Sequence, residues 1–169
     1  MITVLLEIYV YISLFGTTEI ANAALAPGEG ILITAGTEFA VAAAEGGCVF
    51  LEIEATEGFN MNLVKNDTVF SLKELIPYED GKIVNADIVN NAYTKLALMS
   101  FDAGTATPVH AAPGEALVTC LEGEGIINDE GVDYRIHAGE NFTFRTGSLH
   151  KVTAVTKYKM TVLILKKGR

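Results

Sequence analysis

Short apolar segments separated by polar turns fill the second half of the chain. From Lys82 onward, runs rich in β-branched and aromatic residues recur at short intervals, and pairs such as Asn90-Asn91 and Ala138-Gly139 stand between them. This pattern is typical of strands joined by tight turns. The predicted strands are Lys82–Val89, Thr94–Phe101, Ala116–Leu121, Gly125–Asn128, Val132–His137, Asn141–Arg145, His150–Val155 and Lys159–Leu165. With so little helical pattern, the chain is predicted to be all-β, as a sandwich or a barrel.

The apolar start of the chain is interpreted as a further strand. Met1–Phe15 is rich in Val, Ile, Leu and Tyr, and an Ala-x-Ala pair follows at Ala21–Ala23, as in a secretory leader. A leader, however, begins with basic residues and has an uninterrupted apolar core. Here no Lys or Arg precedes Lys65, and Glu7 interrupts the run. The run is also too short to cross a bilayer. We therefore expect neither a cleaved leader nor a membrane span.

Part of the chain repeats after a shift of 111 residues, the separation of Gly28 and Gly139. The glycines, a glutamate and the following strand all keep phase without a gap, which favours a true repeat over chance similarity between glycine-rich hairpins. Phe39 takes the place of His150 in the earlier copy. The matched pairs are Gly28 with Gly139, Glu29 with Glu140, Gly36 with Gly147, Val41 with Val152 and Ile53 with Ile164.

The repeat divides the chain into three predicted parts. Residues 1–60 form a partial copy, residues 61–80 a connector, and residues 81–169 a complete copy. Within the connector, Ser71-Leu-Lys-Glu74 has the pattern of a capping box that opens one helical turn, and Pro77 ends it.

Glycines and histidines in the complete copy resemble the two motifs of the cupin superfamily, G(X)5HXH(X)3,4E(X)6G and G(X)5PXG(X)2H. The first motif is matched by Gly104, His110 and Gly123, and the second by Gly139, Gly147 and His150, with Arg145 where the family has proline. The resemblance implies a cupin jelly roll, or double-stranded β-helix, preceded by an N-terminal partial cupin repeat. The chain looks like a bicupin that lacks the front of its first barrel.

The resemblance also implies where a metal would bind. In metal-binding cupins, two histidines and a glutamate of the first motif join the histidine of the second. His110 and His150 match the first and last of these ligands, whereas Ala112 stands at the second histidine position. A stable site normally uses three or four protein ligands. We therefore expect at most a weakly bound divalent metal, Fe, Mn, Ni or Zn, held by His110 and His150.

The glutamate position needs a separate count. Counting back from Gly123 puts it at Ala116, and Glu115 is one residue away. A shift of one residue turns a strand side chain to the opposite face, so Glu115 is predicted to point outward. A bulge at Pro113-Gly114 would bring it inside instead.

Alternation from the two histidines predicts the lining of the barrel. Ala112, Ala116, Val118 and Phe144 should face inward with His110 and His150. Small apolar walls with a few polar groups are general features of small-molecule sites.

Charge restricts the possible partners. The net charge is −9, which argues against a nucleic-acid backbone as partner. Residues 1–64 carry eight acidic groups and no Lys or Arg, whereas residues 141–169 carry seven basic groups and no Asp or Glu. Such segregation favours packing between these segments, within or between chains. Half a jelly roll also leaves an unpaired strand edge, so a homodimer is predicted.

Cysteine usage indicates the compartment. Cys48 and Cys120 stand in apolar runs with the pattern of strands. They are interpreted as buried thiols in a reducing compartment rather than as a disulfide, which predicts a cytoplasmic protein.

Three functions are compatible with these residues. The first is a module that binds a small organic ligand in the barrel, with His110 and His150 as the remnant of a metal site. The second is a metal-dependent cupin enzyme of the oxygenase, isomerase or decarboxylase type. The third is a purely structural role. Depleted metal ligands and an apolar pocket favour the first, and no residue is assigned as catalytic.

Overall fold

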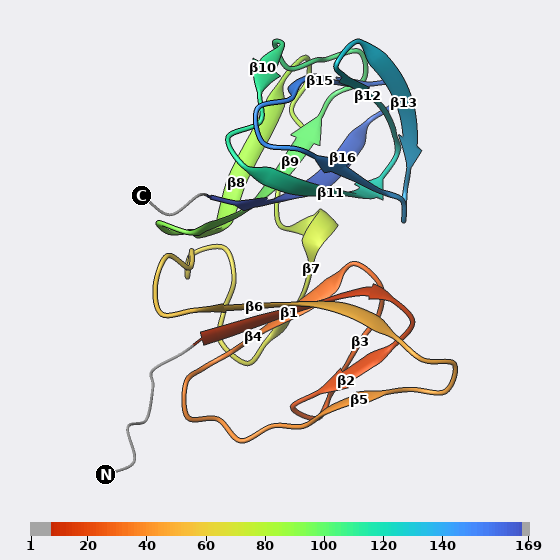
Figure 1. Ribbon diagram of the computed structural model, residues 1–169. Helices are drawn as coiled ribbons and strands as arrows, with labels where there is room; N and C mark the ends of the chain where they lie inside the picture. The colour runs from red at the N-terminus through yellow and green to blue at the C-terminus, as the bar shows by residue number, and fades with distance from the viewer. Residues whose placement is uncertain (1–7, 167–169) are drawn as a thin grey trace. The chain divides into compact units, whose positions relative to one another are not determined.

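The computed structural model describes residues 8–166 and divides into two compact units, Met1–Leu75 and Ile76–Arg169 (Figure 1). The boundary falls within the predicted connector. Nearly all regular structure is β-strand, as the apolar pattern predicts. The described part of the chain contains no helix long and apolar enough to cross a membrane.

The C-terminal unit is built from two antiparallel sheets that face each other. One sheet has the order β14-β11-β16-β9-β8, and the other has the order β10-β15-β12-β13. All eight strands predicted from the sequence are present, within one residue at each end, and a ninth, β10, was not predicted. The strands are β8 (Ile83–Asn90), β9 (Thr94–Phe101), β10 (His110–Ala111), β11 (Glu115–Glu122), β12 (Glu124–Asp129), β13 (Val132–His137), β14 (Asn141–Phe144), β15 (Leu149–Ala154) and β16 (Tyr158–Leu165).

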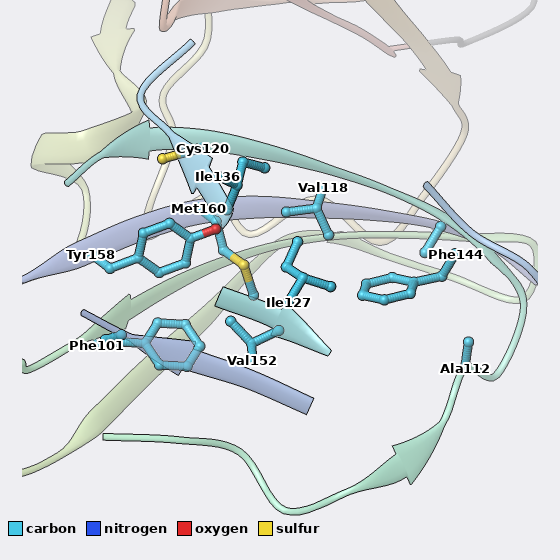
Figure 2. Packing of buried hydrophobic residues seen from close by; sticks show 12 residues of the cluster. Phe101, Ala112, Val118, Cys120, Ile127, Ile136, Phe144, Val152, Tyr158 and Met160 are labelled. Atoms are coloured by element: carbon cyan, nitrogen blue, oxygen red, sulfur yellow. The ribbon is translucent and has the colours of Figure 1, made fainter. Parts of the chain in front are cut away.

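The core of this unit lies between the two sheets. Along β11, burial alternates, so that Val118 and Cys120 face inward while Glu115 is exposed. The prediction that Glu115 points outward is therefore confirmed. Figure 2 shows Ala112 and Phe144 at one end of the core and Tyr158 at the other. Burial of this apolar surface stabilises the unit by roughly 25 cal/mol for each Å² removed from water.

The N-terminal unit repeats the rear of this arrangement. Its sheets have the orders β6-β1-β4-β7 and β3-β2-β5, which match β16-β11-β14 and β13-β12-β15 of the complete copy. Equivalents of β8, β9 and β10 are absent from its described residues. The strands are β1 (Ile8–Phe15), β2 (Thr18–Ile20), β3 (Ala23–Leu25), β4 (Glu29–Ile33), β5 (Val41–Ala43), β6 (Val49–Ala55) and β7 (Val69–Ser71). Residues 1–7 of the predicted first strand lie outside the described range.

A β-bulge occurs at the same place in both copies. The pairing of β1 with β6 shifts register between Ser13 and Phe15, and that of β11 with β16 shifts between Cys120 and Glu122. Each strand then ends at a glycine with positive φ, +68° at Gly16 and +79° at Gly123. A Cβ at either glycine would collide with a backbone carbonyl of the neighbouring hairpin. The bulge bends the sheet at matching points in the two copies.

The glutamate of the repeat has the same contact in both copies. Glu29 Oε2 accepts a hydrogen bond from the backbone N–H of Ala26 at 2.9 Å, and Glu140 Oε2 accepts one from His137 at 2.7 Å. The donors are separated by the same 111 residues as the acceptors. The shared strand order, bulge and turn contact show that the chain carries an N-terminal partial repeat of the C-terminal barrel.

The connector differs from its prediction in two respects. It contributes a strand, β7, which pairs with β4. The helical turn is present as a short 3₁₀ helix, Leu72–Glu74, but the Ser71 side chain makes no capping hydrogen bond. The prediction of a capping box was therefore wrong. The turn is closed instead by the Leu75 backbone N–H, which donates to the carbonyl of Leu72 at 3.3 Å.

Both cysteines are free thiols. Cys120 is buried in β11, as predicted. Cys48 is only half-buried and precedes β6 by one residue, so its assignment to a buried strand position was wrong. The glycine pair before it places Cys48 at the end of a turn.

Candidate functional site

A cavity of about 230 Å³ lies between the sheets of the C-terminal unit. About 10–15 Å³ of such space is enough for one water molecule, so this cavity has room for a small organic molecule. All six residues predicted to line the barrel surround this cavity. The full lining is Asn85, Lys95, Ala97, Met99, Thr107, His110, Ala112, Pro113, Ala116, Val118, Phe144, His150, Val152, Met160, Val162 and Ile164.

Pairing of β10 with β15 brings the two histidines together. His110 lies directly opposite His150 in this antiparallel pair. Their ring centroids are 4.2 Å apart, and the ring planes are inclined by 53°. His110 is exposed at the rim, whereas His150 is 7% exposed. The two imidazoles thus form one polar patch on an otherwise largely apolar wall.

Each imidazole has a backbone carbonyl beside Nδ1. The Nδ1 atom of His110 lies 2.9 Å from the carbonyl oxygen of Pro108, and that of His150 lies 3.3 Å from the oxygen of Ser148. A carbonyl oxygen only accepts hydrogen bonds, so Nδ1 carries the proton in both rings. In the neutral rings, Nε2 then presents a lone pair that can accept a hydrogen bond or bind a metal.

Burial keeps His150 neutral. Removal of the ring from water lowers the pKa of His150 below its ordinary value of 6.5, and the neighbouring His110 lowers it further. The Ser148 carbonyl raises the pKa of His150 by more than His110 lowers it, and the Asp129 carboxylate raises it slightly, but burial has the largest effect. The unprotonated Nε2 is therefore the form present at neutral pH.

Three polar residues of the cavity, Asn85, Lys95 and Thr107, were missed by the sequence reasoning. Lys95 and Asn85 line the wall formed by β9 and β8. Lys95 Nζ lies 3.0 Å from Asp87 Oδ1, and Asn90 Nδ2 donates to Asp87 Oδ2 at 2.7 Å. The period of the strand could have revealed Lys95, because it lies on the same face of β9 as the inward-facing Ala97 and Met99. The inward positions were inferred only from the strands around the histidines.

The N-terminal unit has aromatic rings where the C-terminal unit has its cavity. Tyr9 lies opposite Ile33 and Glu54, as Ala116 lies opposite Phe144 and Ile164. In the last strand of the repeat, Glu54 therefore takes the place of Ile164, and the predicted match of Ile53 with Ile164 was wrong by one residue. By the same correspondence, Tyr11 takes the place of Val118. The third ring is Phe39, at the position of His150, and its centroid is 5.5 Å from that of Tyr11 and 6.1 Å from that of Tyr9. The imidazole pair is not repeated among the described residues of that unit.

Comparison with known proteins identifies the fold family. The cupin domain family model matches residues 97–166, which span β9 to β16 and the whole histidine pair. A cupin 2 conserved barrel domain protein from Leptotrichia buccalis has a similar solved structure, with 29% identity and a TM-score of 0.77 over 96% of this chain and 74% of that chain. The C-terminal barrel has the cupin fold.

Two further solved structures share the fold. A conserved protein of unknown function from Streptococcus pyogenes is 23% identical over 68% of this chain and 99% of that chain, with a TM-score of 0.63. A cupin superfamily protein from Desulfitobacterium hafniense is 16% identical over 62% of this chain and 96% of that chain, with a TM-score of 0.60. The search of curated proteins found no match. Because one fold hosts many functions, the function of this cupin must be argued from its site.

The residues present do not fit the four-ligand metal site of metal-binding cupins. Ala112 and Ala116 occupy the other two ligand positions, and Glu115 points away from the cavity. Within residues 8–166, no group of three or more His, Cys, Asp or Glu side chains is arranged to hold a metal ion. The donor set is limited to two imidazole nitrogens.

Proposed function

We propose that the C-terminal barrel binds a small organic molecule in its cavity. The observation that carries this proposal is the enclosure of about 230 Å³ by mostly apolar side chains, with two adjacent imidazoles on one wall. Pockets of this composition gain affinity from apolar contact and orientation from a few polar atoms. The polar atoms here are Nε2 of His110 and His150 on one wall and the Lys95 ammonium on another.

A metal-dependent cupin enzyme is the second candidate. It is favoured by the adjacent imidazoles of His110 and His150, because a neutral imidazole binds divalent metals through Nε2. With only these two protein ligands, affinity for Fe, Mn, Ni or Zn should be modest, because water would have to complete the coordination shell. This limited donor set is the reason for ranking binding above oxygenase, isomerase or decarboxylase chemistry.

Metal analysis distinguishes the two candidates. The full-length protein, purified without a histidine tag, is dialysed against a weak chelator and analysed by elemental mass spectrometry. Binding without a firmly held metal predicts far less than one metal ion for each chain. Stoichiometric metal that survives dialysis would favour the enzyme. In parallel, native mass spectrometry and a thermal-shift screen of small molecules test whether the cavity takes a ligand.

The proposal extends to assembly, with this cupin as a homodimer that uses its N-terminal unit. β6 is the outer strand of its sheet, whereas its counterpart β16 is followed by β9 and β8. Near one end of β6, Val49 is 54% exposed and Phe50 is 36% exposed. Pairing with a second copy would cover such an edge in both chains. The acidic first third and the basic C-terminal segment supply complementary charge for this association.

A cytoplasmic location is part of the same proposal. Two free thiols, one of them half-buried, are compatible with a reducing compartment. The net charge of −9 argues against nucleic acid and anionic membrane surfaces as partners.

A further inference from the structure

We propose that the ligand of this cavity is an uncharged molecule with an apolar body and a hydroxyl group, of the phenol or alcohol class, whose hydroxyl donates a hydrogen bond to Nε2 of His150. This inference rests on the proposed function, binding of a small organic molecule, and adds the chemical class of that molecule. It follows from the hydrogen bonds, the charges and the space around the histidine pair.

The hydrogen bonds fix what the cavity wall offers. Because Nδ1 of His110 and of His150 faces a backbone carbonyl at 2.9 and 3.3 Å, both rings carry their proton on Nδ1. Nε2 is then an acceptor in each neutral ring. His150 is nearly buried, so a ligand that displaces water from the cavity has to supply a donor to this acceptor. A hydroxyl group supplies one, whereas a hydrocarbon does not.

The charges around the cavity exclude an ionic ligand. The Lys95 ammonium is balanced by the carboxylate of Asp87, which Asn90 also holds. This pair leaves no net charge on that wall. A carboxylate ligand would face the Nε2 acceptor of His150, whose Nδ1 is directed at the Ser148 carbonyl, and it would compete with Asp87 for the ammonium. A cationic ligand would enter a largely apolar cavity whose lining residues include no carboxylate, which is unfavourable.

The remaining walls fit an apolar body of limited size. Val118 and Val152, each at most 2% exposed, face the cavity, and Met160 lies beside them. Space is available because Ala116 stands where the N-terminal unit has Tyr9. In that unit, the centroids of Tyr9 and Tyr11 are 6.3 Å apart, and Phe39 packs on both rings. Ala116 therefore sets how large a ring the cavity accepts.

Three probes of similar size test the inference on the full-length protein at pH 7.5. Phenol has a ring and a donor, toluene has a ring without a donor, and benzoate carries a negative charge. Affinities are measured by calorimetry or by titration of amide resonances. Phenol is expected to bind about tenfold more tightly than toluene, the effect of one satisfied buried acceptor. Benzoate is expected to bind more weakly than phenol by at least the same factor.

Two substitutions copied from the N-terminal unit locate the effect. His150→Phe places the residue found at Phe39 and should abolish the preference for phenol over toluene while toluene still binds. Ala116→Tyr places the residue found at Tyr9 and should abolish binding of both probes. His137→Phe changes a histidine on β13 that lies outside the cavity, and it should leave all three affinities unchanged. Far-UV circular dichroism checks folding of each variant.

A nitrogen-15 measurement on the unmodified protein keeps the test independent of the variants. Phenol should shift the Nε2 resonance of His150, and toluene should leave it nearly unchanged. Equal affinity for phenol and toluene, a phenol preference that survives His150→Phe, or tighter binding of benzoate would each overturn the inference and leave the proposed binding function standing. If neither phenol nor toluene binds the unmodified protein, both the inference and the proposed function are wrong.

Discussion

The imidazole of His150 lies stacked on the ring of Phe144, with centroids 4.0 Å apart and planes inclined by 29°. His110 lies on another side, at 4.2 Å between centroids. The His150 side chain, which is nearly buried, thus lies between the ring of Phe144 and the imidazole of His110. A positive charge on His150 is therefore disfavoured in the folded protein.

The first prediction is a pH dependence of stability that arises from His150. Its pKa in the folded state lies below the ordinary value of 6.5, which the unfolded chain should retain. Above pH 6.5 the imidazole is neutral in both states, and the free energy of unfolding is at its full value. As pH falls from 6.5 toward the folded pKa, the unfolded state binds a proton more readily than the folded state, so the free energy of unfolding decreases. Imidazole resonances followed during a pH titration give the folded pKa. Urea unfolding at several pH values should show the loss, and the His150→Phe variant should lack it. A folded pKa above 6.5 would contradict this prediction.

The second prediction concerns the hydroxyl group of Tyr158. This side chain is fully buried, with its ring 5.6 Å from that of Phe101, and its oxygen has no hydrogen-bond partner among the described residues. A buried hydroxyl without a partner costs about 1–3 kcal/mol. Tyr158→Phe removes only the oxygen, and it should leave stability unchanged or raise it by about 1 kcal/mol in urea unfolding. Tyr134→Phe, on an exposed tyrosine, is the matched control. Clear destabilisation by Tyr158→Phe would reveal a hydrogen bond to a buried water molecule.

The third prediction is that Cys120 is unreactive. Burial raises the pKa of Cys120 to about 11, and the nearby carboxylates of Glu140 and Glu122 act in the same direction. Because the thiolate is the reactive form, little of this thiol is available at neutral pH. In the native protein, a thiol reagent should label Cys48 first and Cys120 only after unfolding. Mass spectrometry of the digested protein assigns the label. Rapid native labelling of Cys120 would disprove the packed-core interpretation.

The fourth prediction is that the full-length chain is a dimer or a larger oligomer at micromolar concentration. The N-terminal unit should be required, because β6 leaves the edge of its sheet open. Light scattering on the full chain and on a variant without residues 1–75 tests this requirement, and circular dichroism confirms that the shorter chain retains its β-structure. If charge complementarity contributes, added salt should weaken the association. A monomeric full-length chain, or a deletion variant that remains dimeric, would be inconsistent with the proposal.

Much of the barrel could be predicted because its strands have strong local signals. Val132–His137 and Thr94–Phe101 were predicted with their observed bounds, since turn residues flank each run. His110 and His150 meet as expected because motif spacing fixes their register. The two-residue strand β10 was missed, because its pairing with β15 depends on the fold and not on local pattern. Asp87 and Lys95 were missed for a similar reason, since their contact joins two strands on a wall away from the motifs.

Other differences come from competition between local patterns and tertiary contacts. The sequence Ser71–Glu74 has the spacing of a capping box, but Ser71 is the last residue of β7 and has extended backbone. Its pairing with Glu29 fixes that conformation, and the side chain does not cap the turn. The repeat was detectable from glycines because positive φ is needed at matching turns, as at Gly28 and Gly139, with φ of +83° and +86°.

The space beside Ala116 has a thermodynamic consequence for the whole barrel. A cavity forgoes dispersion contacts that packed side chains would make, so the ligand-free C-terminal unit is less stable than its strand pairing alone would allow. A ligand that binds only the folded state restores stability by mass action, about 2.7 kcal/mol at a concentration one hundred times its Kd. The melting temperature of this unit should therefore report the concentration of its ligand. The N-terminal unit, whose corresponding space is filled by tyrosine and phenylalanine rings, should melt independently of it.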